Sequence, residues 1–316
     1  MDMSLVNSLY ESVLRIRVVE ECIAEIYHLR EMQTPTHFCV GQEAIPAGVC
    51  AALNPKDILY AYYRSHGWYL AKGGRLQGMI DEFFGKETGC SHGMGGSMHL
   101  IDLEAGFQGT TAIVAGAMPH AVGAAFTQVY RRTGNIVVSS FGDGATEEGL
   151  FQESLMFAAL RHLPIVFICE NNRLATNTHI EDRQPPVPIY KRAASFGVAA
   201  EIVDGNDAVA VYQATVAAVA HARAGGGPSF IECTTYRVLE HCGQSTDYQL
   251  GHRSAEEAKP WLAKDPVARL EAHISKADQQ RLREQYRTEM AATFDRARKA
   301  PFPKQLNPEE ERLCRS

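Results

Sequence analysis

The sequence predicts an α/β fold with a mainly parallel sheet, because short apolar runs alternate with segments of helical periodicity. Residues 136–176 show the pattern most clearly. An apolar run at 136–138 ends in Gly142-Asp143-Gly144, and apolar residues at helical spacing follow from Leu150. A second apolar run, at 164–169, ends in Glu170-Asn171-Asn172. A strand, a helix and a strand of these lengths form a βαβ unit, in which the two strands run parallel.

The remaining elements follow from the same periodicities and from glycine and proline positions. We expect a long amphipathic helix at 4–32 and a helix from about 43. Residues 57–67 are expected to be a strand that runs into a loop containing Arg64. A glycine-rich loop at 85–100 precedes a helix that begins after Pro119. Further along we expect strands at 200–203 and 229–236, helices at 208–224 and 278–299, and mainly helix from 255 onward. The chain is predicted to be one domain: an N-terminal helix (1–34), a core (35–253) and a helical C-terminal region (254–316).

Composition and charge exclude several classes of protein. The 316 residues are 45% hydrophobic and 22% charged, as in soluble globular proteins, and the net charge of −6 gives no basic surface for nucleic acid. The eight cysteines are scattered without a C-x-x-C pair, which is typical of reduced thiols. The sequence has neither a signal peptide nor an apolar run long enough to cross a membrane. We therefore expect a soluble, cytoplasmic protein.

Polar residues follow both strands of the central βαβ unit. The carboxyl ends of neighbouring parallel strands lie at one edge of the sheet, so Asp143 and Asn172 are expected to converge there. Carboxylate and amide oxygens are ligands that Mg²⁺ accepts together with phosphate oxygens. The glycines allow the backbone to approach a ligand closely, and the free N–H groups at a helix start favour an anion.

With this spacing, the Gly-Asp-Gly and Asn-Asn pair resembles the diphosphate-anchoring motif of thiamine-diphosphate enzymes. The surrounding sequence resembles the α subunit of the E1 component of 2-oxoacid and acetoin dehydrogenase complexes. Further similar strings are H-x-x-x-G-Q-E-A from His37, Y-R at 63–64, the glycine-rich stretch 85–100, V-D-G-N-D at 203–207 and Y-R-x-x-x-H at 236–241. The motifs cover residues 35–253, most of the chain.

The resemblance implies thiamine diphosphate and Mg²⁺ as cofactors, with a role for each matching residue. Asp143, Asn172 and the main-chain carbonyl of Leu174 would bind the metal. His37 and His241 would act on the substrate. The cofactor-binding residues would be Tyr63, Arg64, Ala112, Val114, Asp143, Gly144, Ala145, Asn172 and His241, with Ala112 and Val114 holding the aminopyrimidine through main-chain atoms.

Three positions depart from the family pattern. Leu174 stands in place of the usual tyrosine, and Met94 in place of the usual lysine. Cys242 replaces the serine that is phosphorylated in animal pyruvate dehydrogenase, so kinase control at this point is not expected. The string E-H-x-G, with D-Y-x-L-G-x-R beyond it, is closer to acetoin dehydrogenase α subunits. The roles of Met94, Cys242 and the nearby His66 are left open.

The function implied is cleavage of a 2-oxoacid or acetoin through an enamine intermediate, with transfer of the acyl unit to a lipoyl carrier. The glutamate that activates the aminopyrimidine would come from an E1 β subunit in an α2β2 heterotetramer, which would deliver to a lipoyl-bearing E2. Two alternatives remain at this point. One is a non-oxidative acyloin synthase or decarboxylase subunit that uses the same cofactor, and the other is a non-catalytic nucleotide-binding protein, although the chain lacks both G-x-G-x-x-G and G-x-x-x-x-G-K-[ST] motifs.

Overall fold

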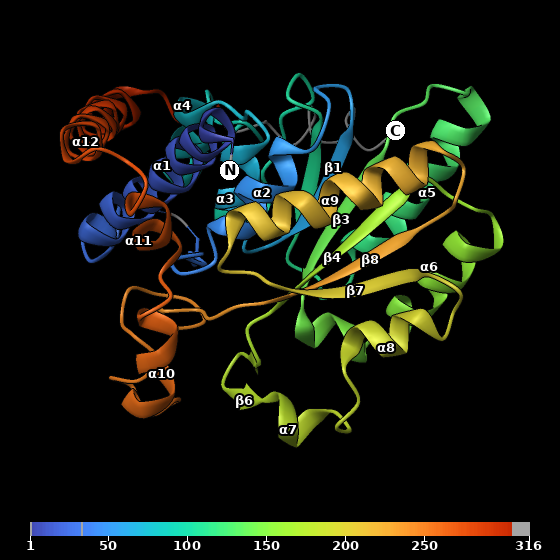
Figure 1. Cartoon of the computed structure of the whole chain (residues 1–316). Coiled ribbons are helices and arrows are strands. Elements are labelled where there is room, and N and C mark those ends of the chain that lie inside the picture. Colours follow the sequence, from blue (N-terminus) through green and yellow to red (C-terminus); the bar gives the residue numbers. More distant parts are fainter. Residues whose placement is uncertain (1, 33, 305–316) are drawn as a thin grey trace.

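A six-stranded, fully parallel sheet lies at the centre of the computed structural model, which describes residues 2–32 and 34–304 (Figure 1). The strand order is β2-β1-β3-β4-β8-β7. The strands are β1 (Ile58–Tyr62), β2 (Phe107–Thr111), β3 (Val137–Gly142), β4 (Ile165–Asn171), β7 (Ala199–Asp204) and β8 (Ser229–Thr234). The predicted α/β fold with a mainly parallel sheet is confirmed.

Helices bury both faces of the sheet, so nearly every residue of the central strands β3 and β4 is buried. Successive side chains of β3 and β4 point to opposite faces, so Val138 and Val166 enter one hydrophobic core and Val137 and Phe167 enter the other. The first core is shared with α1 (Met3–Tyr27), α2 (Ala44–Ala51) and α9 (Ala208–Arg223). The second is shared with α5 (Ala117–Arg131), α6 (Gly149–Leu160) and α8 (Ile189–Ala194), on the opposite side of the sheet from α9 in Figure 1.

The predicted βαβ unit is present as β3, α6 and β4. Gly142 pairs with Glu170 across the two strands, so the chain leaves both at the same edge of the sheet. Two details differ from the prediction. A short 3₁₀ helix, η2 (Asp143–Glu147), comes between β3 and α6, and β4 continues through Asn171 because that residue still pairs with Thr234 of β8.

Several element boundaries also differ from those expected. Helix α1 ends at Tyr27 rather than near residue 32, and Arg30 adopts a left-handed backbone conformation soon afterwards. The chain re-enters helix at once after β1, in α3 (His66–Ala71) and then α4 (Leu76–Phe83). Helix α5 begins before Pro119, which occupies its first turn, where no intrahelical partner is needed for a backbone N–H.

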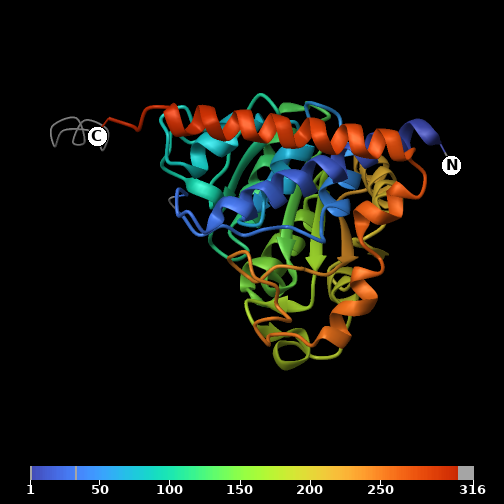
Figure 2. The same ribbon diagram turned by 90° about the vertical axis from the view of Figure 1, so that its left-hand side faces the viewer.

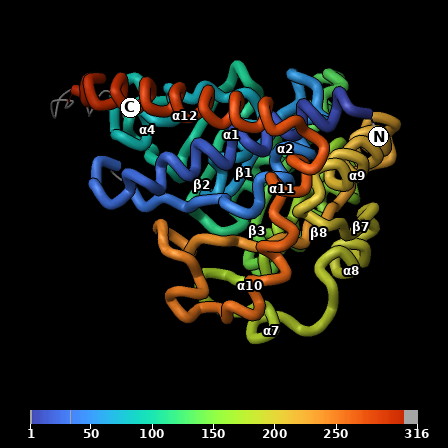
Figure 3. Tube along the Cα trace, turned by 60° about the vertical axis from the view of Figure 1, so that its left-hand side comes forward, coloured from blue at the N-terminus to red at the C-terminus, as the bar shows by residue number. Residues whose placement is uncertain are grey.

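The described part of the predicted C-terminal region, residues 254–304, is mainly helical, as expected, and returns to the start of the chain, whereas residues 305–316 lie outside the described residues. It consists of α10 (Ala255–Leu262), α11 (Pro266–Glu271) and α12 (Lys276–Lys299). Helix α12 lies along α1, as Figures 2 and 3 show from two directions. The remaining short elements are η1 (Gly96–Met98), β5 (Leu174–Ala175), β6 (Thr178–His179) and α7 (Ile180–Arg183).

Two further expectations concern membrane-spanning segments and disulfides, and the structure addresses them only for the residues that it describes. No helix within residues 2–32 and 34–304 has the length and apolar character needed to cross a membrane. The cysteines of the described residues form no disulfide, and Cys314 lies outside that part of the chain. The cytoplasmic location and the division at residues 34 and 253 stay predictions.

Candidate active site

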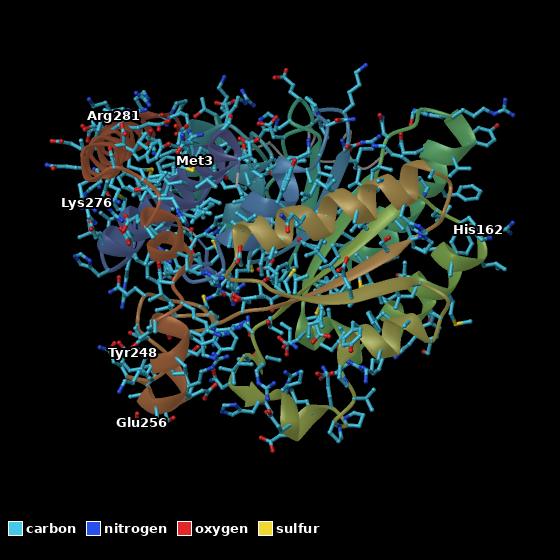
Figure 4. The ribbon with its side chains drawn as sticks, viewed as in Figure 1. Met3, His162, Tyr248, Glu256, Lys276 and Arg281 are labelled. Atoms are coloured by element: carbon cyan, nitrogen blue, oxygen red, sulfur yellow. The ribbon has the colours of Figure 1, made fainter. Side chains whose placement is uncertain are left out.

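A cavity of about 210 Å³ opens at the edge of the sheet where the parallel strands end. Figure 4 labels Tyr248 and Glu256 on the side of the sheet where the strands end, and His162 on the opposite side, where β4 begins. Most residues that the sequence singled out line this cavity: Tyr63, Arg64, Val114, Asp143, Gly144, Ala145, Asn172, Leu174 and His241. They come from the segments that follow β1, β3 and β4, from β5, and from the loops that hold Val114 and His241, so the sheet topology assembles the site.

Two of the predicted site residues do not line the cavity. Ala112 is partly exposed and lies outside the lining, whereas its neighbour Val114 is part of it. His37 is buried behind the wall, where its ring centroid is 5.0 Å from that of His241 and 4.7 Å from that of Tyr63. Sequence reasoning did not single out the other lining residues, which are Tyr62, Ala115, Phe141, Gly142, Glu147, Glu148, Ala175, Thr176 and Arg237.

Asp143 is the acidic group at the end of β3. Its side chain is almost fully buried, and its Oδ2 atom accepts a hydrogen bond from Arg183 Nη2 at 2.5 Å. Burial raises the pKa of the Asp143 carboxyl, although the Arg183 guanidinium acts in the opposite direction. Arg183 also pairs with Glu147 on the cavity wall. No motif in the sequence indicated Arg183, because it reaches Asp143 from α7.

Asn172 follows β4 and uses all of its polar groups. Its Nδ2 donates to Gln42 Oε1 at 3.0 Å, and its Oδ1 accepts from the backbone N–H of Leu174 at 3.1 Å. Its main-chain carbonyl accepts from Arg253 Nη2. The next turn leads into the β5–β6 hairpin, which packs over the Gly-Asp-Gly turn. A Cβ atom at Gly144 would lie 3.0 Å from the Cβ of Ala175, so glycine permits this close approach.

Two buried arginines give this end of the cavity a positive character. Arg64 Nη1 donates to the carbonyl of Phe38 at 2.5 Å, and Nη2 donates to the carbonyl of His241 at 3.2 Å. Arg237 forms a buried ion pair with Asp247, at 2.8 Å between Nη2 and Oδ1. Arg237 belongs to the Y-R-x-x-x-H string, so its motif was visible in the sequence although its place on the cavity wall was not.

The two histidines are neutral at physiological pH. Burial, reinforced by the positive charge of Arg64, lowers the pKa of His37 to about 2 and that of His241 to about 3. The Nδ1 atom of His37 is buried and has no hydrogen-bond partner within the described residues. Neutral imidazoles of this kind can donate or accept a hydrogen bond.

The residues whose roles were left open lie outside the cavity lining. His66 Nδ1 is 2.6 Å from Glu20 Oε1, and its Nε2 is 2.7 Å from Ser97 Oγ, so it links α1 to the glycine-rich loop. Cys242 is half-buried beside the wall, and Met94 is 77% exposed at the tip of the glycine-rich loop. His66 therefore has a structural place, while nothing in the structure explains Met94 or Cys242.

The donor set at the cavity suits a cation that is shared with a bound phosphate. Within residues 2–32 and 34–304, no three His, Cys, Asp or Glu side chains come together as a metal site. Asp143, Asn172 and Leu174 all line the cavity, so a carboxylate, an amide and a main-chain carbonyl belong to residues of its wall. Mg²⁺ is commonly bound in this way, through one or two carboxylates together with phosphate oxygens of a ligand.

Comparison with known proteins agrees with the motifs. The family described as Dehydrogenase E1 component matches residues 10–306. The α subunit of acetoin:2,6-dichlorophenolindophenol oxidoreductase from Bacillus subtilis is 43% identical over 233 residues, which cover 74% of this chain and 70% of that protein. The pyruvate dehydrogenase E1 component α subunit of Porphyra purpurea is 41% identical over 274 residues, 84% of this chain and 78% of that protein.

A third relative carries the same name as the first. The acetoin:2,6-dichlorophenolindophenol oxidoreductase α subunit of Cupriavidus necator is 36% identical over 242 residues, 76% of this chain and 72% of that protein. The two alternative functions left open by the sequence receive no support from these relatives. The chain belongs to the dehydrogenase E1 component family, as an α-subunit-type chain of the thiamine-diphosphate-dependent 2-oxoacid dehydrogenases.

Proposed function

We propose that the chain binds thiamine diphosphate and Mg²⁺ in the cavity at the carboxyl ends of β1, β3 and β4. The observation that supports this proposal is that Asp143, Asn172 and Leu174 line one cavity together with Arg64 and His241. The first three would hold the cation through a carboxylate, an amide oxygen and a main-chain carbonyl.

The chain's own residues would bind and orient the reactants. Tyr63, Arg64 and His241 would face the diphosphate, where the positive charge of Arg64 offsets phosphate charge. His241, which is neutral and lines the cavity, would hydrogen-bond the substrate oxygen or carboxylate, and His37, behind the wall, would support the position of the His241 ring. When bound, thiamine diphosphate supplies a carbon nucleophile for attack on the substrate carbonyl.

A partner subunit would complete the site. The relatives are named as α subunits, and the acidic residues on the cavity wall other than Asp143 are Glu147 and Glu148. Glu147 is already paired with Arg183. The side chains of Ile113 and Val114 are 68% and 42% exposed beside the cavity, where a second chain would cover them. We propose an E1 β subunit as this partner, in an α2β2 heterotetramer that delivers the acyl unit to a lipoyl-bearing E2.

The substrate would be acetoin or a small 2-oxoacid. The sequence after His241 favours acetoin, and both oxidoreductase relatives carry acetoin in their names. Because another relative is named a pyruvate dehydrogenase α subunit, 2-oxoacids are the second candidate class of substrate. Comparing reductive acylation of a lipoyl domain from acetoin and from pyruvate, with the co-expressed β subunit, distinguishes the two.

Calorimetric titration of thiamine diphosphate in Mg²⁺ tests the binding proposal. With the β subunit co-expressed, we expect Asp143→Ala to weaken binding at least about 100-fold, because the anionic metal ligand is lost. Glu153→Ala removes an exposed carboxylate of α6 and should bind as the wild type does. The proposal would be wrong if the wild-type complex bound no cofactor, or if Asp143→Ala bound it equally well.

A further inference from the structure

We propose that Trp68, Glu170 and Gln42 form a hydrogen-bond chain that fixes the orientation of the Asn172 side-chain amide and so presents its oxygen to the cation. Glu170 and Gln42 are then positioning residues, since neither lines the cavity. This inference rests on the proposed function, because Asn172 serves as a ligand only if the cation binds there.

The chain consists of four consecutive contacts. Trp68 Nε1 donates to Glu170 Oε1, and Gln42 Nε2 donates to Glu170 Oε2 at 2.6 Å. Asn172 Nδ2 donates to Gln42 Oε1 at 3.0 Å. The backbone N–H of Leu174 donates to Asn172 Oδ1 at 3.1 Å. The contacts link α3, the end of β4, the turn before α2 and the loop after β4.

The direction of every bond in the chain is fixed by its two ends. The Trp68 indole and the Leu174 backbone amide can only donate. Glu170 therefore accepts from Trp68 and presents its second oxygen to Gln42, which must turn its NH₂ group toward Glu170. The Gln42 oxygen then faces Asn172, which must turn its own NH₂ group toward Gln42. Because both ends of the hydrogen-bond chain are donors, the Asn172 oxygen must lie on the side of Leu174.

Burial prevents water from relieving a mismatch. Gln42 is 0%, Glu170 1% and Trp68 1% exposed, and Asn172 is 5% exposed. Two donors or two acceptors that face each other at such depth lose their hydrogen bonds without replacement. If one oxygen of Glu170 is replaced by an NH₂ group, Gln42 must therefore reorient, and Asn172 must reorient in turn.

Glu170→Gln makes that exchange with almost no change of shape. The new amide oxygen is needed by Trp68, so its NH₂ group faces Gln42. Gln42 must then rotate and offer its own NH₂ group to Asn172, which already presents NH₂. Either a donor pair stays unmatched or Asn172 rotates and its oxygen leaves the Leu174 side.

A reciprocal double variant separates this effect from packing. When Glu170→Gln and Gln42→Glu are combined, Trp68 donates to the amide oxygen of the new side chain at position 170. The NH₂ group of that side chain donates to the new carboxylate at position 42. That carboxylate also accepts from Asn172, so the Asn172 amide keeps its native orientation. The double variant has the same composition and net charge as the wild type.

The test is the dissociation constant of Mn²⁺, followed by electron paramagnetic resonance in the presence of thiamine diphosphate and the co-expressed β subunit. We expect about 10–100-fold weaker Mn²⁺ binding in Glu170→Gln, the size typical of groups that orient metal ligands. Gln42→Glu keeps an acceptor oxygen toward Asn172 and places two carboxylates face to face at Glu170, so it should lower the stability of the fold and leave Mn²⁺ binding close to that of the wild type. The double variant should recover to within about threefold of the wild type.

Each outcome decides a separate point. If the wild type binds Mn²⁺ and Glu170→Gln binds it equally well, the hydrogen-bond chain is overturned and the cation site is left intact. The same conclusion follows if the double variant binds Mn²⁺ as weakly as Glu170→Gln. Failure of the wild type itself to bind Mn²⁺ would overturn the proposed function and this inference together. Denaturation of the metal-free proteins reports folding. If a single variant does not fold, recovery of folding and Mn²⁺ binding in the double variant supports the proposal, and failure of either rejects it.

Discussion

His37 and His241 show how burial sets the chemistry of individual residues. Both rings lie against Tyr63 and near the Arg64 guanidinium, in surroundings that disfavour a second positive charge. Their pKa values fall to about 2 and about 3, so neither histidine is charged at neutral pH. The same shift links the site to the stability of the fold, because an unfolded chain would protonate these rings near pH 6.5.

The first prediction concerns this pH dependence. Because the folded-state pKa values are depressed, the unfolded state binds more protons below about pH 6.5, and the free energy of unfolding falls as the pH is lowered toward about 3. Each histidine contributes a slope of up to about 1.4 kcal/mol per pH unit. Urea denaturation at pH 7 and pH 5 should show a loss about 2 kcal/mol smaller in His37→Gln than in the wild type.

The control for this measurement is His273→Gln, in an exposed position before α12. It should keep the wild-type dependence on pH. Equal losses of unfolding free energy in His37→Gln and the wild type would show that the folded protein protonates His37 normally.

At the scale of elements, a single carboxylate organises the glycine-rich loop. Glu82 of α4 is fully buried and accepts hydrogen bonds from four backbone N–H groups of the loop. The donors and their distances are Ser91 at 2.7 Å, Gly93 at 2.8 Å, Gly95 at 2.6 Å and Gly96 at 3.0 Å. Glu82 is therefore the side chain that holds the glycine-rich loop in place.

The second prediction follows from those four bonds. Glu82→Ala leaves several buried N–H groups without an acceptor and should lower the free energy of unfolding by about 3–5 kcal/mol. Glu82→Gln keeps one acceptor oxygen and should lie between Glu82→Ala and the wild type. Glu87→Ala, on the exposed side of the same loop, should change stability by less than about 0.5 kcal/mol. Urea denaturation measures all three, and equal effects at Glu82 and Glu87 would contradict this role.

At the scale of the whole molecule, the two ends of the described chain are held together by α1 and α12. Apolar side chains of α12, including Met290 and Phe294, enter the core that also contains α1. Ion pairs join the exposed faces of the two helices, with Arg287 to Glu25 at 2.8 Å and Arg283 to Glu21 at 3.2 Å. Burial and not these surface ion pairs should supply most of the stability, because exposed ion pairs contribute little.

The third prediction compares the two kinds of contact. Met290 is 0% exposed, so Met290→Ala leaves a cavity and should lower the free energy of unfolding by about 2–5 kcal/mol. Glu25→Gln removes only the exposed ion pair and should cost less than about 1 kcal/mol. Guanidinium denaturation of the two variants checks the order, and a larger loss in Glu25→Gln would show that charge holds the ends together.

Local patterns in the sequence were sufficient to predict the α/β fold and the place of the central motif. Backbone rules for strands and helices act locally and repeat along the chain, so periodicity predicted β3, α6 and β4. The parallel arrangement then required Asp143 and Asn172 to converge. Motif resemblance added Tyr63, Arg64 and His241, which line the same cavity.

The contacts that support the site depend instead on tertiary packing. Arg183 meets Asp143, Asp247 meets Arg237, and Gln42 links Glu170 to Asn172. Ala112 falls outside the cavity lining, and His37 lies behind its wall. These contacts join segments that are far apart or irregularly spaced along the chain, so the periodic patterns that predict strands and helices carry no information about them. Which buried polar groups meet depends on how the helices and loops pack, and a buried group must find its partner wherever the fold places one.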